Sequence, residues 1–160
     1  MGLSDVARRG VEHHASVISP AGHALLDIQQ QGEDMMSERN KRIAIAFHQK
    51  TLNEFDAATA AAQHGGKRYI QHNPLVEDGF EGMGKFVDWI RANYPEARTE
   101  LKRVFADGDF VILHSRWIRA PGARGDAVVD IFRLENGKIV EHWDVIQPIP
   151  ETSANGNTMF

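Results

Sequence analysis

Hydrophobic positions recur with a helical period through the first half of the chain and with a strand period near its end. Over residues 37–55, apolar side chains return at three- and four-residue spacing, which predicts a helix with one buried stripe. A short alanine-rich helix is predicted over residues 56–64, where a Gly-Gly pair ends it. Residues 67–74 are typical of an extended segment closed by a proline, and a third helix is predicted over residues 81–93.

After Pro95 the hydrophobic period changes to two. Residues 99–118 indicate a strand, a turn at Asp107-Gly108 and a second strand, and residues 128–146 indicate another hairpin. Helices followed by a run of antiparallel strands predict an α+β fold. In that fold about three helices pack on one face of a curved antiparallel sheet.

Composition and charge narrow the classes of function. The chain has 160 residues, a formal net charge of −4 and no cysteine. The acidic balance does not favour nucleic-acid or anionic-membrane binding, and no apolar run approaches the roughly 18 residues that cross a bilayer. Without cysteine there is no disulfide and no thiol nucleophile. We therefore expect a single cytoplasmic domain with neither a nucleic acid nor a membrane as its partner.

One hairpin, VVDIFRLENGKIVEHWDVI over residues 128–146, places three titratable side chains among apolar ones. These are Asp130, His142 and Asp144. If all three face inward, they suit acid–base chemistry in an apolar pocket. If they alternate outward, they are ordinary surface residues.

The turn of this hairpin allows two registers. A two-residue loop made of the Asn-Gly pair would place Asp130 opposite Trp143, on the face away from His142. A three-residue loop over residues 135–137, with its glycine in the left-handed conformation and a bulge, would place Asp130 opposite His142. A one-residue change of register moves every side chain of a strand to the other face. We favour the three-residue loop.

This register divides the hairpin into two faces. One face would be a pocket floor with a polar centre, made of Val128, Asp130, Phe132, Val140, His142, Asp144 and Ile146. On the other face Arg133 and Glu141 would be diagonal partners among Val, Ile and Trp side chains. That outer face is too apolar to be left bare, so we expect a homodimer through it.

With these features the chain resembles a known family, the SnoaL-like polyketide cyclases of the nuclear-transport-factor-2-like superfamily. The resemblance is carried by Tyr69-Ile70-Gln71-His72-Asn73-Pro74, the strand from Val111 to Ser115, Asp130-Ile131-Phe132-Arg133, and the stretch from Gly137 to Asp144. It covers about residues 37–147. We therefore divide the chain into an N-terminal arm (1–36), a SnoaL-like domain (37–147) and a C-terminal tail (148–160). The arm is expected to hold short helical pieces near Val6–His14 and Ala24–Gln30.

The resemblance implies a cone-shaped apolar cavity and a cofactor-independent enzyme. In the family, an aspartate on the last strands, helped by a nearby histidine, shuttles a proton during aldol closure. Related folds house ketosteroid isomerase and an epoxide hydrolase. By this resemblance Asp144 is the base and Asp130 its acid–base partner, while His142 and His72 polarise or orient. The expected substrate contacts are Tyr69, Asn73, His114 and Phe132.

The leading prediction is thus an enzyme for aldol-type cyclisation, isomerisation or hydration and hydrolysis of a small apolar molecule that bears a carbonyl. Three alternatives stay open. The hairpin residues could form a purely structural network. His72, His114 and His142 could bind zinc or non-haem iron together with Asp130 or Asp144, although their spacing matches no compact ligand motif and we predict no metal. The domain could also be a non-catalytic ligand-binding or dimerisation module.

Overall fold

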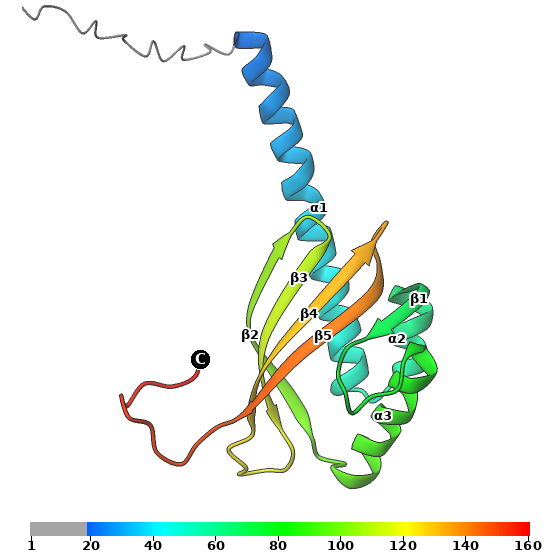
Figure 1. Cartoon of the computed structure of the whole chain (residues 1–160), viewed down its shortest axis with the longest axis vertical. Coiled ribbons are helices and arrows are strands. Elements are labelled where there is room, and N and C mark those ends of the chain that lie inside the picture. The colour runs from blue at the N-terminus through cyan, green and yellow to red at the C-terminus, as the bar shows by residue number, and fades with distance from the viewer. Residues whose placement is uncertain (1–18) are drawn as a thin grey trace, which may run out of the picture.

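Within residues 19–160, three helices pack on one five-stranded sheet, which confirms the predicted α+β class (Figure 1). The computed structural model describes residues 19–160. Its elements are α1 (Pro20–Leu52), α2 (Ala57–His64), β1 (Gly65–Gln71), α3 (Gly79–Asn93), β2 (Arg98–Asp107), β3 (Phe110–Ile118), β4 (Asp126–Glu135) and β5 (Lys138–Pro148). None of the helices in this described part is both long and apolar enough to span a membrane.

The sheet is mixed rather than fully antiparallel. Its strand order is β1-β5-β4-β3-β2, and the neighbours from β2 to β5 are antiparallel. β1 instead runs parallel to β5. A helix and three strands separate the two along the chain, so no tight hairpin dictates their relative direction.

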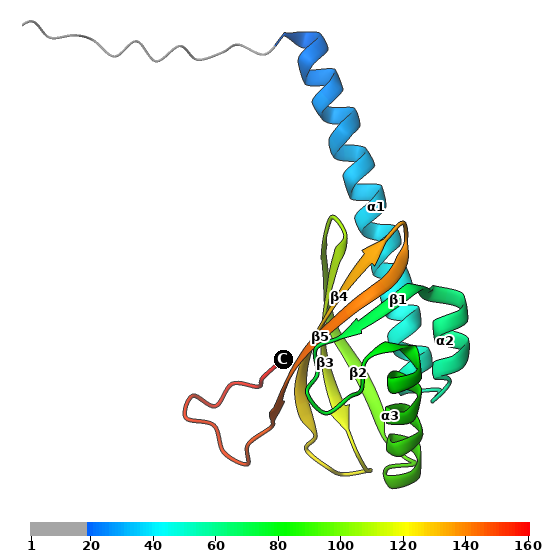
Figure 2. The same cartoon turned by 45° about the vertical axis from the view of Figure 1, so that its right-hand side comes forward.

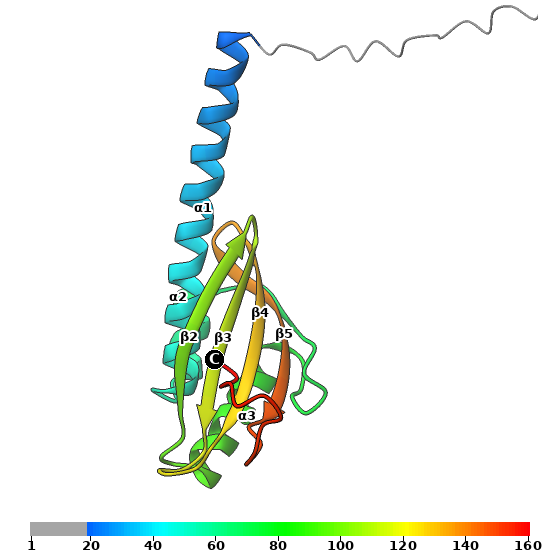
Figure 3. The same ribbon diagram turned by 90° about the vertical axis from the view of Figure 1, so that its left-hand side faces the viewer.

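The helices cover one face of the sheet, and the segment after β5 lies on the other (Figures 2 and 3). The core between helices and sheet is aromatic. Phe47 of α1 meets the ring of Phe132 on β4 edge-on at 5.7 Å and the ring of Tyr69 on β1 at 6.2 Å. All three side chains are buried, and each such burial stabilises the fold by about 2 kcal/mol.

Helix α1 is longer than its buried stripe. It begins at Pro20, not at Ser37 as predicted, and its first half extends beyond the sheet (Figure 1). Pro20 suits a first helical turn, and the residues that follow are mostly good helix formers. The apolar side chains of this segment are exposed: Leu25, Ile28 and Met35 are 68%, 66% and 74% exposed. The sequence therefore shows no buried hydrophobic stripe that would have predicted this part of the helix. The helical piece expected at Val6–His14 lies outside the described residues, and the division into arm, domain and tail stays a prediction.

The β4–β5 hairpin turns through two residues. Glu135 pairs with Lys138, so the loop is Asn136-Gly137, and the predicted three-residue loop is wrong. Both loop residues have positive φ angles, 53° and 72°, as a type I′ turn requires. This turn matches the right-handed twist of the strands that it joins.

A bulge beyond the turn restores the predicted inner face. Leu134 pairs with Ile139, but Arg133 pairs with Glu141, which leaves Val140 as the extra residue on β5. The bulge shifts the register by one, so Asp130 lies opposite Asp144 rather than opposite His142 or Trp143. Arg133 and Glu141 are accordingly direct rather than diagonal partners, with an ion pair of 2.7 Å.

Candidate active site

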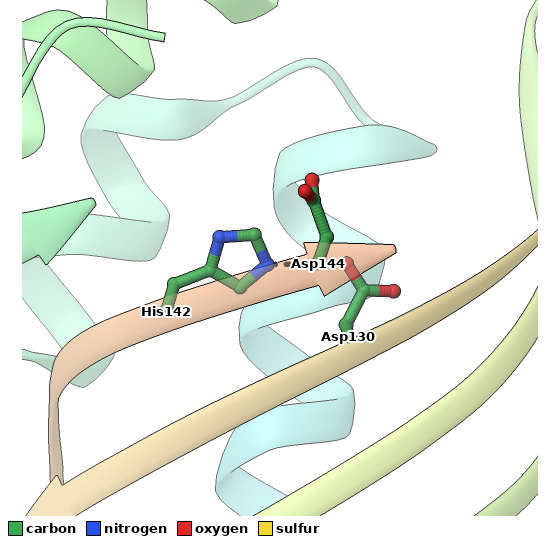
Figure 4. Close-up of side chains that lie close together, drawn as sticks. All are labelled: Asp130, His142 and Asp144. Atoms are coloured by element: carbon green, nitrogen blue, oxygen red, sulfur yellow. Dashed lines mark hydrogen bonds and ion pairs between the residues drawn. The ribbon is translucent and has the colours of Figure 1, made fainter. Parts of the chain in front are cut away.

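Three titratable side chains of the hairpin converge beneath the helices (Figure 4). Asp130 comes from β4, and His142 and Asp144 come from β5, two residues apart on the same face. The Nε2 atom of His142 lies 3.1 Å from Oδ1 of Asp130. One polar atom from each of the three residues lies within 4.8 Å of the others.

Helix α1 adds a second histidine that the sequence reasoning missed. His48 is buried, and its Nε2 lies 3.4 Å from Oδ2 of Asp130. The carboxylate of Asp130 therefore lies between two imidazoles. The sequence does contain a pattern that could have indicated His48. It follows Ala44 by four residues, and so lies on the same buried helix face, next to Phe47.

The contacts of Gln71 set the protonation of His142. Oε1 of Gln71 accepts the backbone N–H of Asn73 at 2.9 Å, which identifies this atom as the oxygen of the amide. Nδ1 of His142 lies 3.0 Å from the same oxygen and must donate to it. A second proton then lies between Nε2 of His142 and Asp130. We assign the pair as imidazolium and carboxylate.

Asp130 is a buried carboxylate that stays ionised. Burial by itself raises the pKa of Asp130, but the hydrogen bonds and charges of His142 and His48 outweigh it. The net pKa of Asp130 lies below its ordinary value of 3.8. Paired in this way, the charge can persist in the interior.

Asp144 is shifted in the opposite direction. It is half-buried, and burial raises the pKa of Asp144 more than its other contacts lower it. Those contacts are a 2.6 Å hydrogen bond from Nδ2 of Asn73 and the charge of His142, while the nearby Asp130 raises the pKa further. Two carboxylates on facing strand positions thus have different proton affinities, which is the pattern of an acid–base pair.

A cavity of about 70 Å³ lies next to these groups. Its wall is largely apolar and includes Phe47, Tyr69, Met83, Val87 and Phe132. The hydroxyl of Tyr69 accepts a hydrogen bond from Nε2 of Gln71 at 3.4 Å, and its own proton has no acceptor among residues 19–160. Burial raises the pKa of Tyr69 well above its ordinary range, so the hydroxyl remains a neutral donor.

Two predicted site histidines lie on the outer face of the sheet, which corrects their expected pocket positions. The ring of His72 stacks on Trp143 at 4.6 Å, and its Nε2 lies 2.9 Å from Oε1 of Glu141. Strand alternation explains this, because Gln71 points inward and the next residue points outward. His114 faces Arg103, 3.2 Å away, and the ring of Phe160.

This placement also separates the three histidines of the alternative metal site. Of His72, His114 and His142, only His142 lies on the inner face of the sheet, beside the cavity. Tyr69 and Phe132 line the cavity, and Asn73 donates a hydrogen bond to Asp144, which also lines it. The structure therefore brings together six of the eight residues selected from the sequence, and it adds His48 and Gln71.

A family model described as the SnoaL-like domain matches residues 44–142, which is more than half of the chain. The chain belongs to the SnoaL-like domain family. No curated protein matches it.

Solved structures of this SnoaL-like type share its fold. A candidate polyketide cyclase from Bacillus cereus is 18% identical with a TM-score of 0.59, over 68% of this chain and 74% of its own. A candidate isomerase of the SnoaL-like family from Agrobacterium tumefaciens is 20% identical with a TM-score of 0.56, over 69% and 98%. AclR, a candidate hydroxylase from Streptomyces galilaeus, is 23% identical with a TM-score of 0.56, over 71% and 81%. At these identities the likeness establishes the fold and leaves the reaction open.

Within this SnoaL-like domain the titratable cluster suits proton transfer better than metal binding. Asp130, His142 and Asp144 are close enough to surround a cation. However, Asp130 already contacts His142 through one oxygen and His48 through the other. A cation held by the three residues would have to displace the proton between His142 and Asp130, whereas proton transfer leaves this contact in place.

Proposed function

We propose that the protein is a cofactor-independent enzyme that removes a proton next to the carbonyl of a small, largely apolar molecule. The observation that carries this proposal is the pairing of Asp130 and Asp144. They face each other across two strands beside an apolar cavity, and their pKa values are shifted in opposite directions. Environments that separate two carboxylates in this way assign one as the proton acceptor.

Asp144 is the base of this proposal. Its raised pKa makes it a better proton acceptor than an exposed aspartate. Asn73 donates to Oδ2 at 2.6 Å and fixes the carboxylate, which leaves Oδ1 for the substrate. In the reaction the C–H bond breaks, its electron pair forms the enolate, and the proton moves to Asp144.

Tyr69 is the donor to the developing enolate oxygen. Its hydroxyl is buried at the cavity wall, its proton is uncommitted, and its raised pKa keeps that proton in place. A neutral donor aimed at the site of developing charge stabilises the transition state more than the ground state. This role goes to Tyr69 because both N–H groups of His142 are already engaged by Gln71 and Asp130.

Asp130 and His142 set the charge around the base, and His48 flanks Asp130 on its other side. The imidazolium of His142 lowers the pKa of Asp144 and so limits how far burial raises it. The relatives named as cyclase and isomerase candidates support a reaction of this kind, because aldol closure and isomerisation both begin with deprotonation next to a carbonyl.

Hydrogen–deuterium exchange tests the proposal without knowledge of the natural substrate. Small cyclic ketones such as cyclohexanone are incubated with the protein in D₂O, and loss of the α-proton signal is followed by ¹H NMR. We expect the wild type to accelerate exchange, Asp144→Asn to lose the acceleration by about 10²–10⁴-fold, and Tyr69→Phe to lose part of it.

Two matched variants serve as controls. Asp88→Asn removes a surface carboxylate of α3, and Tyr94→Phe removes a phenolic hydroxyl at the end of that helix, outside the cavity lining. Both should exchange ketone protons at the wild-type rate. Binding of the ketones with no acceleration in the wild type would contradict the proposal and favour a non-catalytic binding module.

A further inference from the structure

A second compartment of about 50 Å³ adjoins the first. Asp130 and Asp144 line both spaces, together with His48, Leu52 and Phe86. The proposed proton acceptor therefore lies at the boundary between two compartments. A molecule that reacts at Asp144 can extend to either side of it.

The second compartment has two unpaired hydrogen-bonding groups of its own, which the first compartment does not share. Thr99 of β2 and Trp117 of β3 line it, and both Oγ1 of Thr99 and Nε1 of Trp117 are buried without a hydrogen-bond partner within residues 19–160. Buried polar groups in folded proteins are nearly always paired, so two unpaired donors beside one cavity point to a missing acceptor.

Thr99 is also held firmly in place. Its backbone N–H donates to Oδ1 of Asn53 at 2.7 Å, and its carbonyl accepts from Nδ2 of the same asparagine at 3.1 Å. This two-point contact ties the start of β2 to the end of α1. The unpaired hydroxyl is therefore presented from a fixed backbone, which is the requirement for a specific binding group.

We propose that this compartment is a subsite for a second, neutral oxygen acceptor of the substrate, such as a ketone, ester or amide oxygen. The proposal rests on the proposed function, which places the reacting carbonyl at Tyr69. The indole of Trp117 can only donate, so its partner must be an acceptor.

The charges around the subsite select a neutral group. Asp130 and Asp144 line the compartment and would repel a carboxylate. The guanidinium of Arg119 lies over the ring of Trp117 at 4.4 Å, but it is paired with the buried Asp126 at 2.6 Å. That cation is thereby neutralised, and a ligand carboxylate gains little from it.

Two probes that differ in one atom group test the subsite. Cyclohexane-1,4-dione carries a second carbonyl opposite the first, and 4-methylidenecyclohexanone has a C=CH₂ group of similar shape in its place. The dione has two equivalent ketones and the methylidene compound has one, so each probe offers a ketone to the reactive site. We expect the wild type to bind the dione about tenfold more tightly in calorimetry or NMR titration, as one to two added hydrogen bonds would give.

Variants assign this preference to particular residues. Thr99→Val keeps the shape of its side chain, Trp117→Phe removes the indole N–H together with one ring, and the double variant should bind the two probes with nearly equal affinity. Thr51→Val is the matched control. The Thr51 hydroxyl in the first compartment already donates to the carbonyl of Phe47 at 2.7 Å, so this variant should retain the tenfold preference. Thr99→Val removes an unpaired polar atom, so the thermal midpoint of this variant should equal or exceed that of the wild type. The same measurement verifies that the variant is folded.

The outcomes separate this proposal from the proposed function. Equal binding of both probes by the wild type, or a preference that survives in the double variant, overturns the subsite. A preference that the double variant loses, in a protein that does not accelerate α-proton exchange, supports the subsite and overturns the proposed catalysis. Asp144→Asn should lose exchange and keep the preference.

Discussion

Replacing Asp130 by asparagine should destabilise the protein severely, because its buried carboxylate lies between His142 and His48. The carboxylate contacts His142 at 3.1 Å and His48 at 3.4 Å in a buried site. A charged hydrogen bond of this kind contributes about 1.5–3 kcal/mol, and asparagine keeps one acceptor oxygen for one of the two rings. Breaking a buried pair on one side costs about 3–5 kcal/mol. We therefore expect Asp130→Asn to lower the free energy of unfolding by about 3 kcal/mol.

Urea unfolding at pH 6 measures this loss. With a denaturant dependence of about 2 kcal/mol per molar, the midpoint should fall by about 1.5 M. The pKa of Asp130 is lowered in the folded state, so its stabilisation is fully present above the ordinary value of 3.8 and is lost as pH falls through the lower folded value. The gap between variant and wild type should therefore shrink in acid. Asp88→Asn should shift stability by less than about 0.5 kcal/mol. Equal midpoints for Asp130→Asn and wild type at pH 6 would refute an ionised, paired Asp130.

Three further predictions concern other positions. The pKa of Asp144 is raised in the folded state, so its ionisation costs stability at neutral pH. Asp144→Asn should therefore be more stable than the wild type in urea unfolding at pH 7. A stability advantage of the variant that grows below pH 3.8 would contradict a raised pKa. Gly137→Ala forces a side chain into positive φ and should cost about 1–2 kcal/mol in the same assay, whereas no loss would contradict the type I′ turn. The exposed outer-face residues Phe105 and Val145 lead us to propose a homodimer through that face, and analytical ultracentrifugation should show Trp143→Lys dissociating a dimer. A monomeric wild type at micromolar concentration removes that proposal.

Most of the fold was predictable because its elements bury their apolar residues periodically. The helix stripe around Phe47, the strand alternation and the Gly65 stop all lie where the pattern places them. The helical piece expected at Ala24–Gln30 is part of α1, but its full extent from Pro20 and its continuity with the helix from residue 37 were missed because this half of α1 is exposed. A helix held by propensity alone has no hydrophobic period to reveal it.

The sequence predicted the correct inner face of the β4–β5 hairpin but the wrong turn between its strands. Asn-Gly favoured the two-residue loop, and that loop is present. The bulge at Val140 was not visible in the sequence, because Ile139 and Val140 are both apolar and both buried, so period two cannot show which residue is extra. His48 joins the site only through packing of α1 on the sheet. His72 was misplaced because family position did not fix the direction of its side chain.

The central claim is that Asp144 is the base of the site and lies beside an Asp130 that stays ionised. A ¹³C NMR titration of the aspartate carboxyl carbons measures both groups in one experiment, with Asp130→Asn and Asp144→Asn to assign the signals. The account predicts that Asp144 titrates above 3.8 and that Asp130 stays ionised below it. Two carboxyls that titrate together at the ordinary value, or in the reverse order, would contradict it.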